Sequence, residues 1–174
     1  MILRLLFLAL LALPATAGAQ THAVAQLGRI DHVADGDTVD LTNGAKVRLV
    51  QIDTPEVYFT PECYGAQASR ITKRLLAPGT LVLLTREPAT DSVDQYHRQL
   101  RYVTRAEDGL DVNVQLVRVG AAAPYFYDGR RGRYARLLDR LARHARAAHL
   151  GLWGACPGTP YDPDRGVATG PLRP

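Results

Sequence analysis

Apolar and polar residues alternate along several short stretches of this chain, a pattern typical of β-strands that bury one face. The alternation is clearest in residues 48–56, which read R-L-V-Q-I-D-T-P-E, and it is stopped by Pro55. Leu49, Gln51 and Asp53 would share one side of a continuous strand, with Arg48 on the other. Four further strands are predicted at residues 25–33, at 38–41, at 81–85 and from 100 onward.

Three other segments carry apolar residues at helical spacing. They are residues 64–77, 111–120 and 130–150. Pro78 and Gly79 end the first, while Asp111 is a suitable N-cap and Gly120 a suitable stop for the second. Five short strands with helices between and after them place the chain in the α+β class. This order is also compatible with a five-stranded OB-type β-barrel with three helices.

The two ends of the chain differ in character from the middle. Arg4 precedes an apolar run at 5–13, followed by Pro14 and the small residues of an A-G-A cleavage site at 17–19. Residues 1–19 therefore read as a signal peptide, because the run is too short to span a bilayer. We expect an exported protein, periplasmic or secreted, with no membrane span after cleavage. One domain at 20–156 and a disordered proline-rich tail at 157–174 would remain.

Charge and cysteine content add two modest constraints. The formal net charge of +4 favours polyanionic partners, although it would equally suit a merely soluble secreted protein. Cys63 and Cys156 are an even number in an exported chain, so a disulfide is the default expectation. Two buried thiols or a metal pair are the alternatives, and neither has histidines nearby to support it.

Acidic residues gather around the longest alternating stretch. If the strands on either side of the Asn43-Gly44 turn pair, Asp37 and Asp53 come close together. Two facing carboxylates require a cation, and hard oxygen ligands suit Ca²⁺ or Mg²⁺ better than zinc. The alternatives are turn aspartates that accept backbone N–H bonds, especially Asp35, and an edge strand with solvated charges.

Six motifs follow one another in a fixed order: D-G-D-T, R-L-x-x-I-D-T-P-E, Y-G-x-x-A-S, D-x-Y-x-R-x-L-x-Y, V-N-x-x-L-V-R-x-G and G-L-W. In this order they resemble the staphylococcal nuclease (thermonuclease) family, and the resemblance covers roughly residues 28–156. It implies an OB-type barrel that hydrolyses phosphodiester bonds of DNA and RNA with Ca²⁺, shows little sequence preference and leaves 3′-phosphates.

The resemblance also implies a role for each matching residue. Attack of water on a phosphodiester builds negative charge around phosphorus, so the site needs cationic groups, an ion and a group that orients the water. Arg48 and Arg98 would be the catalytic phosphate clamps and Glu56 the catalytic carboxylate that orients water. The metal ligands would be Asp37, Asp53 and the carbonyl of Thr54.

Tyrosines near these positions are candidates for substrate binding. Tyr125 and Tyr127 correspond to a tyrosine pair in the family, and Tyr96 lies within the motif that carries Arg98. Such rings can stack on bases or bond a phosphate. Ordinary packing remains the alternative.

The chain departs from the family pattern in two places. His97 and Gln99 flank Arg98 where the family usually has glycine on one or both sides. His97 is a conceivable general base, but a histidine without a positioned partner is more often structural. The loop at 57–63 is shorter and less lysine-rich than in the best-known family member, which puts DNA affinity from this loop in doubt.

Two other functional classes remain open at this point. One is an exported nucleic-acid-binding module of OB type without catalysis, although no catalytic arginine or carboxylate of the family is missing here. The other is a structural or partner-binding envelope protein, supported only by the prolines and by the arginines of 130–150. A solvated helix face also accounts for those arginines. We expect a monomer with DNA and RNA as substrates.

Overall fold

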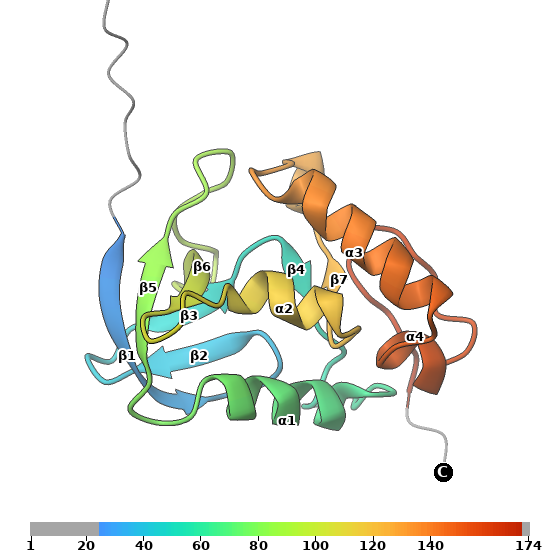
Figure 1. The fold of residues 1–174 in the computed structure, drawn as a ribbon, viewed down its shortest axis with the longest axis horizontal. Helices are drawn as coiled ribbons and strands as arrows, with labels where there is room; N and C mark the ends of the chain where they lie inside the picture. Colours follow the sequence, from blue (N-terminus) through green and yellow to red (C-terminus); the bar gives the residue numbers. More distant parts are fainter. Residues whose placement is uncertain (1–24, 172–174) are drawn as a thin grey trace, which may run out of the picture.

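A closed five-stranded barrel forms the body of the molecule in the computed structural model, which describes residues 25–171 (Figure 1). The predicted signal peptide lies outside these residues. The strands are neighbours in the order β1-β2-β3-β6-β5, and β5 closes on β1. Their bounds are β1 (Gln26–Val33), β2 (Thr38–Leu41), β3 (Lys46–Leu49), β5 (Leu81–Thr85) and β6 (Gln99–Arg105). The predicted α+β fold with an OB-type barrel is confirmed.

Helices and a second small sheet complete the domain. The three predicted helices are present, and a fourth helix of one turn follows them: α1 (Gly65–Leu75), α2 (Val112–Arg118), α3 (Ala135–Ala147) and α4 (Leu152–Ala155). Strands β4 (Ile52–Asp53) and β7 (Ala123–Pro124) pair with each other, and β7 packs against α3. In Figure 1 this small sheet lies between the barrel and α3. No helix within residues 25–171 is both long and apolar enough to cross a membrane.

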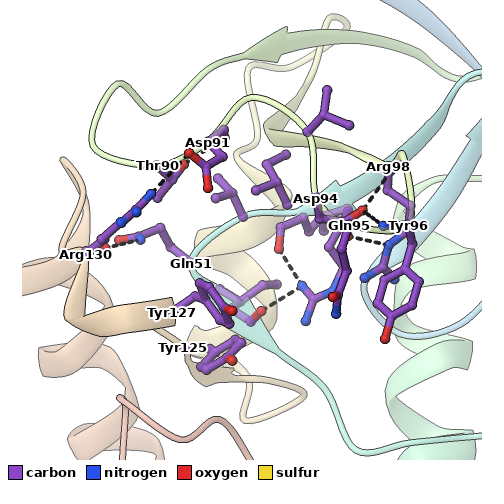
Figure 2. Close-up of a pocket in the computed structure, with 16 residues that line it drawn as sticks. Gln51, Thr90, Asp91, Asp94, Gln95, Tyr96, Arg98, Tyr125, Tyr127 and Arg130 are labelled. Atoms are coloured by element: carbon purple, nitrogen blue, oxygen red, sulfur yellow. Dashed lines mark hydrogen bonds and ion pairs between the residues drawn. The ribbon is translucent and has the colours of Figure 1, made fainter.

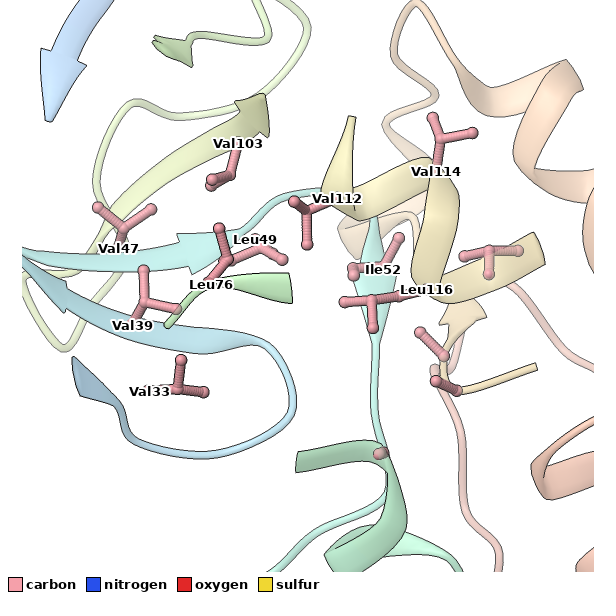
Figure 3. Packing of buried hydrophobic residues seen from close by; sticks show 14 of the residues in the cluster. Val33, Val39, Val47, Leu49, Ile52, Leu76, Val103, Val112, Val114 and Leu116 are labelled. Atoms are coloured by element: carbon pink, nitrogen blue, oxygen red, sulfur yellow. The ribbon is translucent and has the colours of Figure 1, made fainter. Parts of the chain in front are cut away.

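The barrel interior is filled by the apolar face of each strand. Val39, Val47, Leu49 and Val103 are fully buried and face side chains from the helices (Figure 3). From α2 and the end of α1 come Val112, Leu116 and Leu76, which continue this core toward the small sheet (Figure 3). Alternation along the strands thus separates a dry interior from the outer face.

The strand predicted to run through residues 48–56 is interrupted, so the prediction of one continuous strand is wrong. β3 ends at Leu49, a turn follows, and β4 resumes at Ile52. Gln51 adopts a left-handed backbone with φ of 67° and is buried. Its side-chain amide donates to the carbonyl of Arg130 and accepts from the N–H of Gly132, both at 2.7 Å. These long-range bonds hold the turn in a conformation that few non-glycine residues adopt.

The third helix begins at Ala135 rather than at residue 130. The preceding backbone is held elsewhere, because Gly132 donates to Gln51 and Arg133 donates to the carboxylate of Glu87. A short 3₁₀ turn, η1 (Tyr127–Gly129), lies upstream. Residues 130–134 therefore belong to a loop fixed by side chains.

Cys63 and Cys156 form a disulfide, as predicted. The segment that follows it, residues 157–171, packs against the domain, which differs from the disordered tail that its proline content predicted. Phe126 donates its N–H to the carbonyl of Pro163, and Cys63 donates to the carbonyl of Gly170. Prolines disfavour regular strands and helices, but an irregular segment is stable when neighbouring elements satisfy its backbone groups. Residues 157–171 are called the C-terminal segment below.

Candidate active site

Arg48 is the centre of a buried cluster at the end of β3. One terminal nitrogen donates to the carbonyls of Leu49 and Ile52, at 2.7 and 2.8 Å. Its Nε lies 2.9 Å from Oδ1 of Asp37, and its other terminal nitrogen lies 2.8 Å from Oδ1 of Asp53. The turn at residues 50–51 makes this possible, because Arg48 and Asp53 would lie on opposite faces of an uninterrupted strand. The carboxylates predicted to approach each other thus meet on one guanidinium.

Asp37 is held by the turn before β2 and by the end of β4. Its second carboxylate oxygen accepts from the backbone N–H and the hydroxyl of Thr54, at 2.9 and 3.1 Å. Gly36 leaves room for this contact, because a Cβ there would lie 2.3 Å from the hydroxyl oxygen of Thr54. Asp35 accepts the N–H groups of Asp37 and Thr38. The turn alternative therefore describes Asp35, whereas Asp37 faces the cluster.

The two carboxylates outnumber the one guanidinium that joins them. Burial raises the pKa of Asp37 and of Asp53, and the attraction of Arg48 only partly opposes this effect. Two ionised carboxylates and Arg48 would carry a formal charge of −1 in a shielded place, where a further cation is favourable. Within residues 25–171, no three acidic, histidine or cysteine side chains converge on one point. A metal here would need carbonyl oxygens and water besides the two carboxylates, which is ordinary coordination for Ca²⁺.

Glu56 lies on the exposed loop after β4. Its backbone is fixed at both groups, because its N–H donates to the side chain of Glu62 and its carbonyl accepts from the N–H of Glu62. Gly65, at the start of α1, packs directly on this carbonyl, since a Cβ there would lie 2.2 Å from the oxygen. Partial burial, followed by repulsion from Asp53 and Asp35, raises the pKa of Glu56. The carboxylate therefore lies within the field of the Arg48 cluster while remaining accessible.

Arg98 is oriented by a tight turn before β6. Asp94 accepts the N–H groups of Tyr96 and Arg98 through one carboxylate oxygen, and the Nε of Arg98 at 2.8 Å through the other. A terminal nitrogen of Arg98 reaches the hydroxyl of Thr38 at 3.2 Å, and the guanidinium carbon lies 5.3 Å from the ring centre of Tyr96. The role of Asp94 was missed from the sequence. Its spacing of four residues from Arg98 in the D-x-Y-x-R motif was the available signal.

His97 occupies the left-handed region at the tip of this turn, with φ of 61°. Its N–H donates to the carbonyl of Asp94, and within the described chain its imidazole makes no hydrogen bond or ion pair. Glycine adopts this backbone conformation at little cost, which explains the family preference for glycine beside the arginine. These contacts favour the structural role of His97.

A cavity of about 360 Å³ joins the two arginines. It is lined by Arg48, Arg98 and the three tyrosines predicted to bind substrate: Tyr96, Tyr125 and Tyr127. The rings of Tyr125 and Tyr127 meet edge to face, with centroids 6.2 Å apart. Gln51 and Arg130 also line it, on the side away from Arg98 and Tyr96 (Figure 2). No local sequence pattern pointed to these two residues, because their contact joins positions 79 apart in the chain.

Comparison with known proteins identifies relatives of this domain. A family model described as staphylococcal nuclease homologue matches residues 46–155. Endonuclease YhcR of Bacillus subtilis (strain 168) is 36% identical over 111 residues, which cover 57% of this chain and 9% of that protein. An uncharacterized endonuclease of Escherichia coli O157:H7 is 34% identical over 129 residues, covering 72% of this chain and 76% of the relative. The chain thus spans a small part of the first relative and most of the second.

Proposed function

The chain belongs to the staphylococcal nuclease family, hydrolases of nucleic-acid ester bonds, and on that premise we propose that it is an exported Ca²⁺-dependent nuclease. It cuts DNA and RNA with little sequence preference and leaves 3′-phosphates. The observation that carries the proposal is the meeting of Arg48, Arg98 and three tyrosines in one cavity, next to the paired carboxylates.

Each side chain of the site has a distinct role toward the phosphate or the attacking water. Arg98 presents a planar fork to phosphate oxygens, and Asp94 holds the orientation of that fork. Arg48 adds positive charge from a fixed position in the same cavity. Glu56 accepts a proton or hydrogen bond from the attacking water, and its raised pKa suits that exchange. Each group acts on charge that develops only as water attacks phosphorus.

The paired carboxylates are the proposed metal site. Asp37, Asp53 and the carbonyl of Thr54 would hold Ca²⁺, whose charge would stabilise the negative oxygens of the phosphate during the reaction. The excess of carboxylate over guanidinium charge at this point supports the assignment. Asp53 and Asp37 also keep Arg48 in place, so the residues that bind the ion orient a phosphate clamp as well.

The residues that line the cavity support weak sequence preference. Tyr96, Tyr125 and Tyr127 offer aromatic faces, and stacking on them tolerates any base. Export is supported by the apolar N-terminal run and by the disulfide, which suits an oxidising compartment. We take the active form to be a monomer.

Purified protein beginning at residue 20 tests the proposal with plasmid DNA and with RNA. We expect both to be degraded in Ca²⁺, cleavage to stop with a chelator, and the products to require a phosphatase before 3′-end extension. Glu56→Gln, made in the same background, controls for contaminating nucleases. If wild type binds both nucleic acids but cuts neither with any divalent metal, the catalytic proposal fails and the non-catalytic binding module stands.

A further inference from the structure

The C-terminal segment reaches the proposed metal site. The backbone N–H of Val167 donates to Oδ2 of Asp53 at 2.9 Å. Asp53 is thereby held at both oxygens, since Oδ1 accepts from Arg48. Residue 167 lies beyond the matched family region, which ends at 155. The contact therefore joins Asp53, within the matched region, to a residue beyond it.

Several contacts fasten this segment on both sides of Val167. Upstream, the carbonyl of Pro163 accepts the N–H of Phe126 at 2.7 Å. Downstream, the carbonyl of Gly170 accepts the N–H of Cys63, and the hydroxyl of Thr169 donates to the carbonyl of Cys63 at 2.7 Å. The side chain of Val167 is itself buried in an apolar cluster with Ala123, Ala145, Leu152 and Trp153. The position of the Val167 N–H is thus fixed by contacts with the domain and with the disulfide-bonded loop.

Gly166 shows how closely the segment approaches Asp53. A Cβ on Gly166 would lie 2.6 Å from Oδ2 of Asp53, closer than real Cβ contacts occur, and 3.5 Å from the ring of Tyr125. Gly166 also has a φ of +75°. Gly170 has nearly the same backbone, with φ of +77°, but a Cβ there would meet nothing within 4 Å. The two glycines therefore share a backbone conformation and differ in their distance from the carboxylate.

We propose that the C-terminal segment positions Asp53 for metal binding, with the Val167 N–H as the positioning group. A carboxylate held at both oxygens has little freedom to rotate, so it faces Asp37 before an ion arrives. Outer groups of this kind typically change metal affinity by about 10- to 100-fold when removed. This inference rests on the proposed function, because it assigns Asp53 to the metal site.

Gly166→Ala and Gly170→Ala form the matched test, made in the oxidised chain beginning at residue 20. Calorimetric titration with Ca²⁺ alone should show about tenfold weaker binding for Gly166→Ala and unchanged binding for Gly170→Ala. The Asp53 side-chain ¹³C resonance of the Ca²⁺-free protein should move only in Gly166→Ala. Melting temperatures should fall in both variants, because both substitutions place alanine at positive φ, and should fall further in Gly166→Ala, whose Cβ also clashes with Asp53.

A truncation after Asp164 gives a second measurement, since it removes Val167 but keeps Pro163 and the disulfide. Its Ca²⁺ affinity should match that of Gly166→Ala. The positioning role is overturned if Gly166→Ala and the truncation bind Ca²⁺ as tightly as wild type or more tightly. It is also overturned if wild type binds no Ca²⁺. If wild type binds Ca²⁺ without cutting nucleic acid, the proposed function fails and the positioning role is judged from the binding data alone. If wild type cuts nucleic acid in Ca²⁺ and the two glycine variants bind Ca²⁺ with the same affinity, the positioning role fails and the proposed function stands.

Discussion

The two arginines of the site are held in different ways. Arg48 is bonded to two carboxylates and two backbone carbonyls, and 12% of its side chain is exposed. Arg98 is bonded to one carboxylate and one hydroxyl, and 25% of its side chain is exposed. Arg48 joins β3 to β4, whereas Arg98 closes a turn within its own loop.

This difference separates folding from substrate recognition. Arg48 compensates buried carboxylates, so the fold itself depends on its charge. Arg98 has an accessible terminal nitrogen on a loop anchored by Asp94, so its charge is available to a phosphate. Residue type and family motif alone would predict the same role for both arginines. The contacts predict that substitutions at the two positions have different consequences.

The largest expected effect is on stability at Arg48. Replacing Arg48 by methionine leaves Asp37 and Asp53 buried without their partner, so the free energy of unfolding should fall by about 3–5 kcal/mol. Arg98→Met should lower it by about 1 kcal/mol or less, since its pair with Asp94 is partly solvated. Urea denaturation of the oxidised proteins at pH 7 measures both. Arg140→Met, on the exposed face of α3, is the control, and equal losses at 48 and 98 would contradict the distinction.

At Arg98, substitution should affect catalysis much more than stability. Arg98→Lys keeps the charge but loses the planar fork, so kcat should fall by about 10², or roughly 2.7 kcal/mol of transition-state stabilisation. The midpoint of urea unfolding should hardly change. Initial rates on one oligonucleotide in saturating Ca²⁺ measure the loss, with Arg140→Lys as the charge-matched control. A rate within threefold of wild type would mean that Arg98 does not contact the reacting phosphate.

Glu87, a buried carboxylate away from the site, has a lowered pKa, whereas the pKa of Asp37 is raised. Burial raises the pKa of Glu87, but bonds from the Ala89 N–H, the Arg133 N–H and the Tyr102 hydroxyl outweigh it and lower the pKa. A lowered folded-state pKa contributes stability above the unfolded pKa, and this contribution is lost as pH falls through the folded pKa. Glu87→Gln should therefore cost about 1–3 kcal/mol at pH 7.

The difference between wild type and Glu87→Gln should shrink as pH falls below about 4.3, the ordinary pKa of glutamate. Urea midpoints from pH 7 to pH 3 follow this change. A difference that stays constant across this range would show that packing, and not the ionised carboxylate, is responsible.

The smallest effect is expected at His97, on the loop that carries Arg98. Glycine removes the strain of the left-handed backbone but increases the conformational entropy of the unfolded chain. Because these effects oppose each other, His97→Gly should change the free energy of unfolding by less than about 1 kcal/mol. His97→Ala tests the imidazole separately, and the pH dependence of kcat should stay that of wild type. A tenfold loss of kcat in both variants would restore His97 as a general base.

Much of this site was accessible from the sequence because it lies in short motifs. The approach of Asp37 and Asp53 was predicted from strand pairing across the Asn43-Gly44 turn. The observed pairing of Thr38 with Arg48 and the turn at residues 50–51 together produce it. The disulfide was the default expectation for two cysteines in a chain predicted to be exported. Alternation along β1, β2 and β3 indicated strands that bury one face, and so the α+β class, because such burial depends on local periodicity. The family resemblance implied the barrel.

The sequence by itself determined which residues are available and which strands and helices carry them. Tertiary structure decided where the strand at 48–56 breaks, because Gln51 leaves β geometry only to bond with residues 130 and 132. It also brought Val167 to Asp53, 114 residues apart in the chain. Local periodicity records which face of an element is buried. It does not record which distant backbone group will satisfy a buried amide or carboxylate, and at this site those long-range bonds place Arg48, Asp53 and the C-terminal segment together.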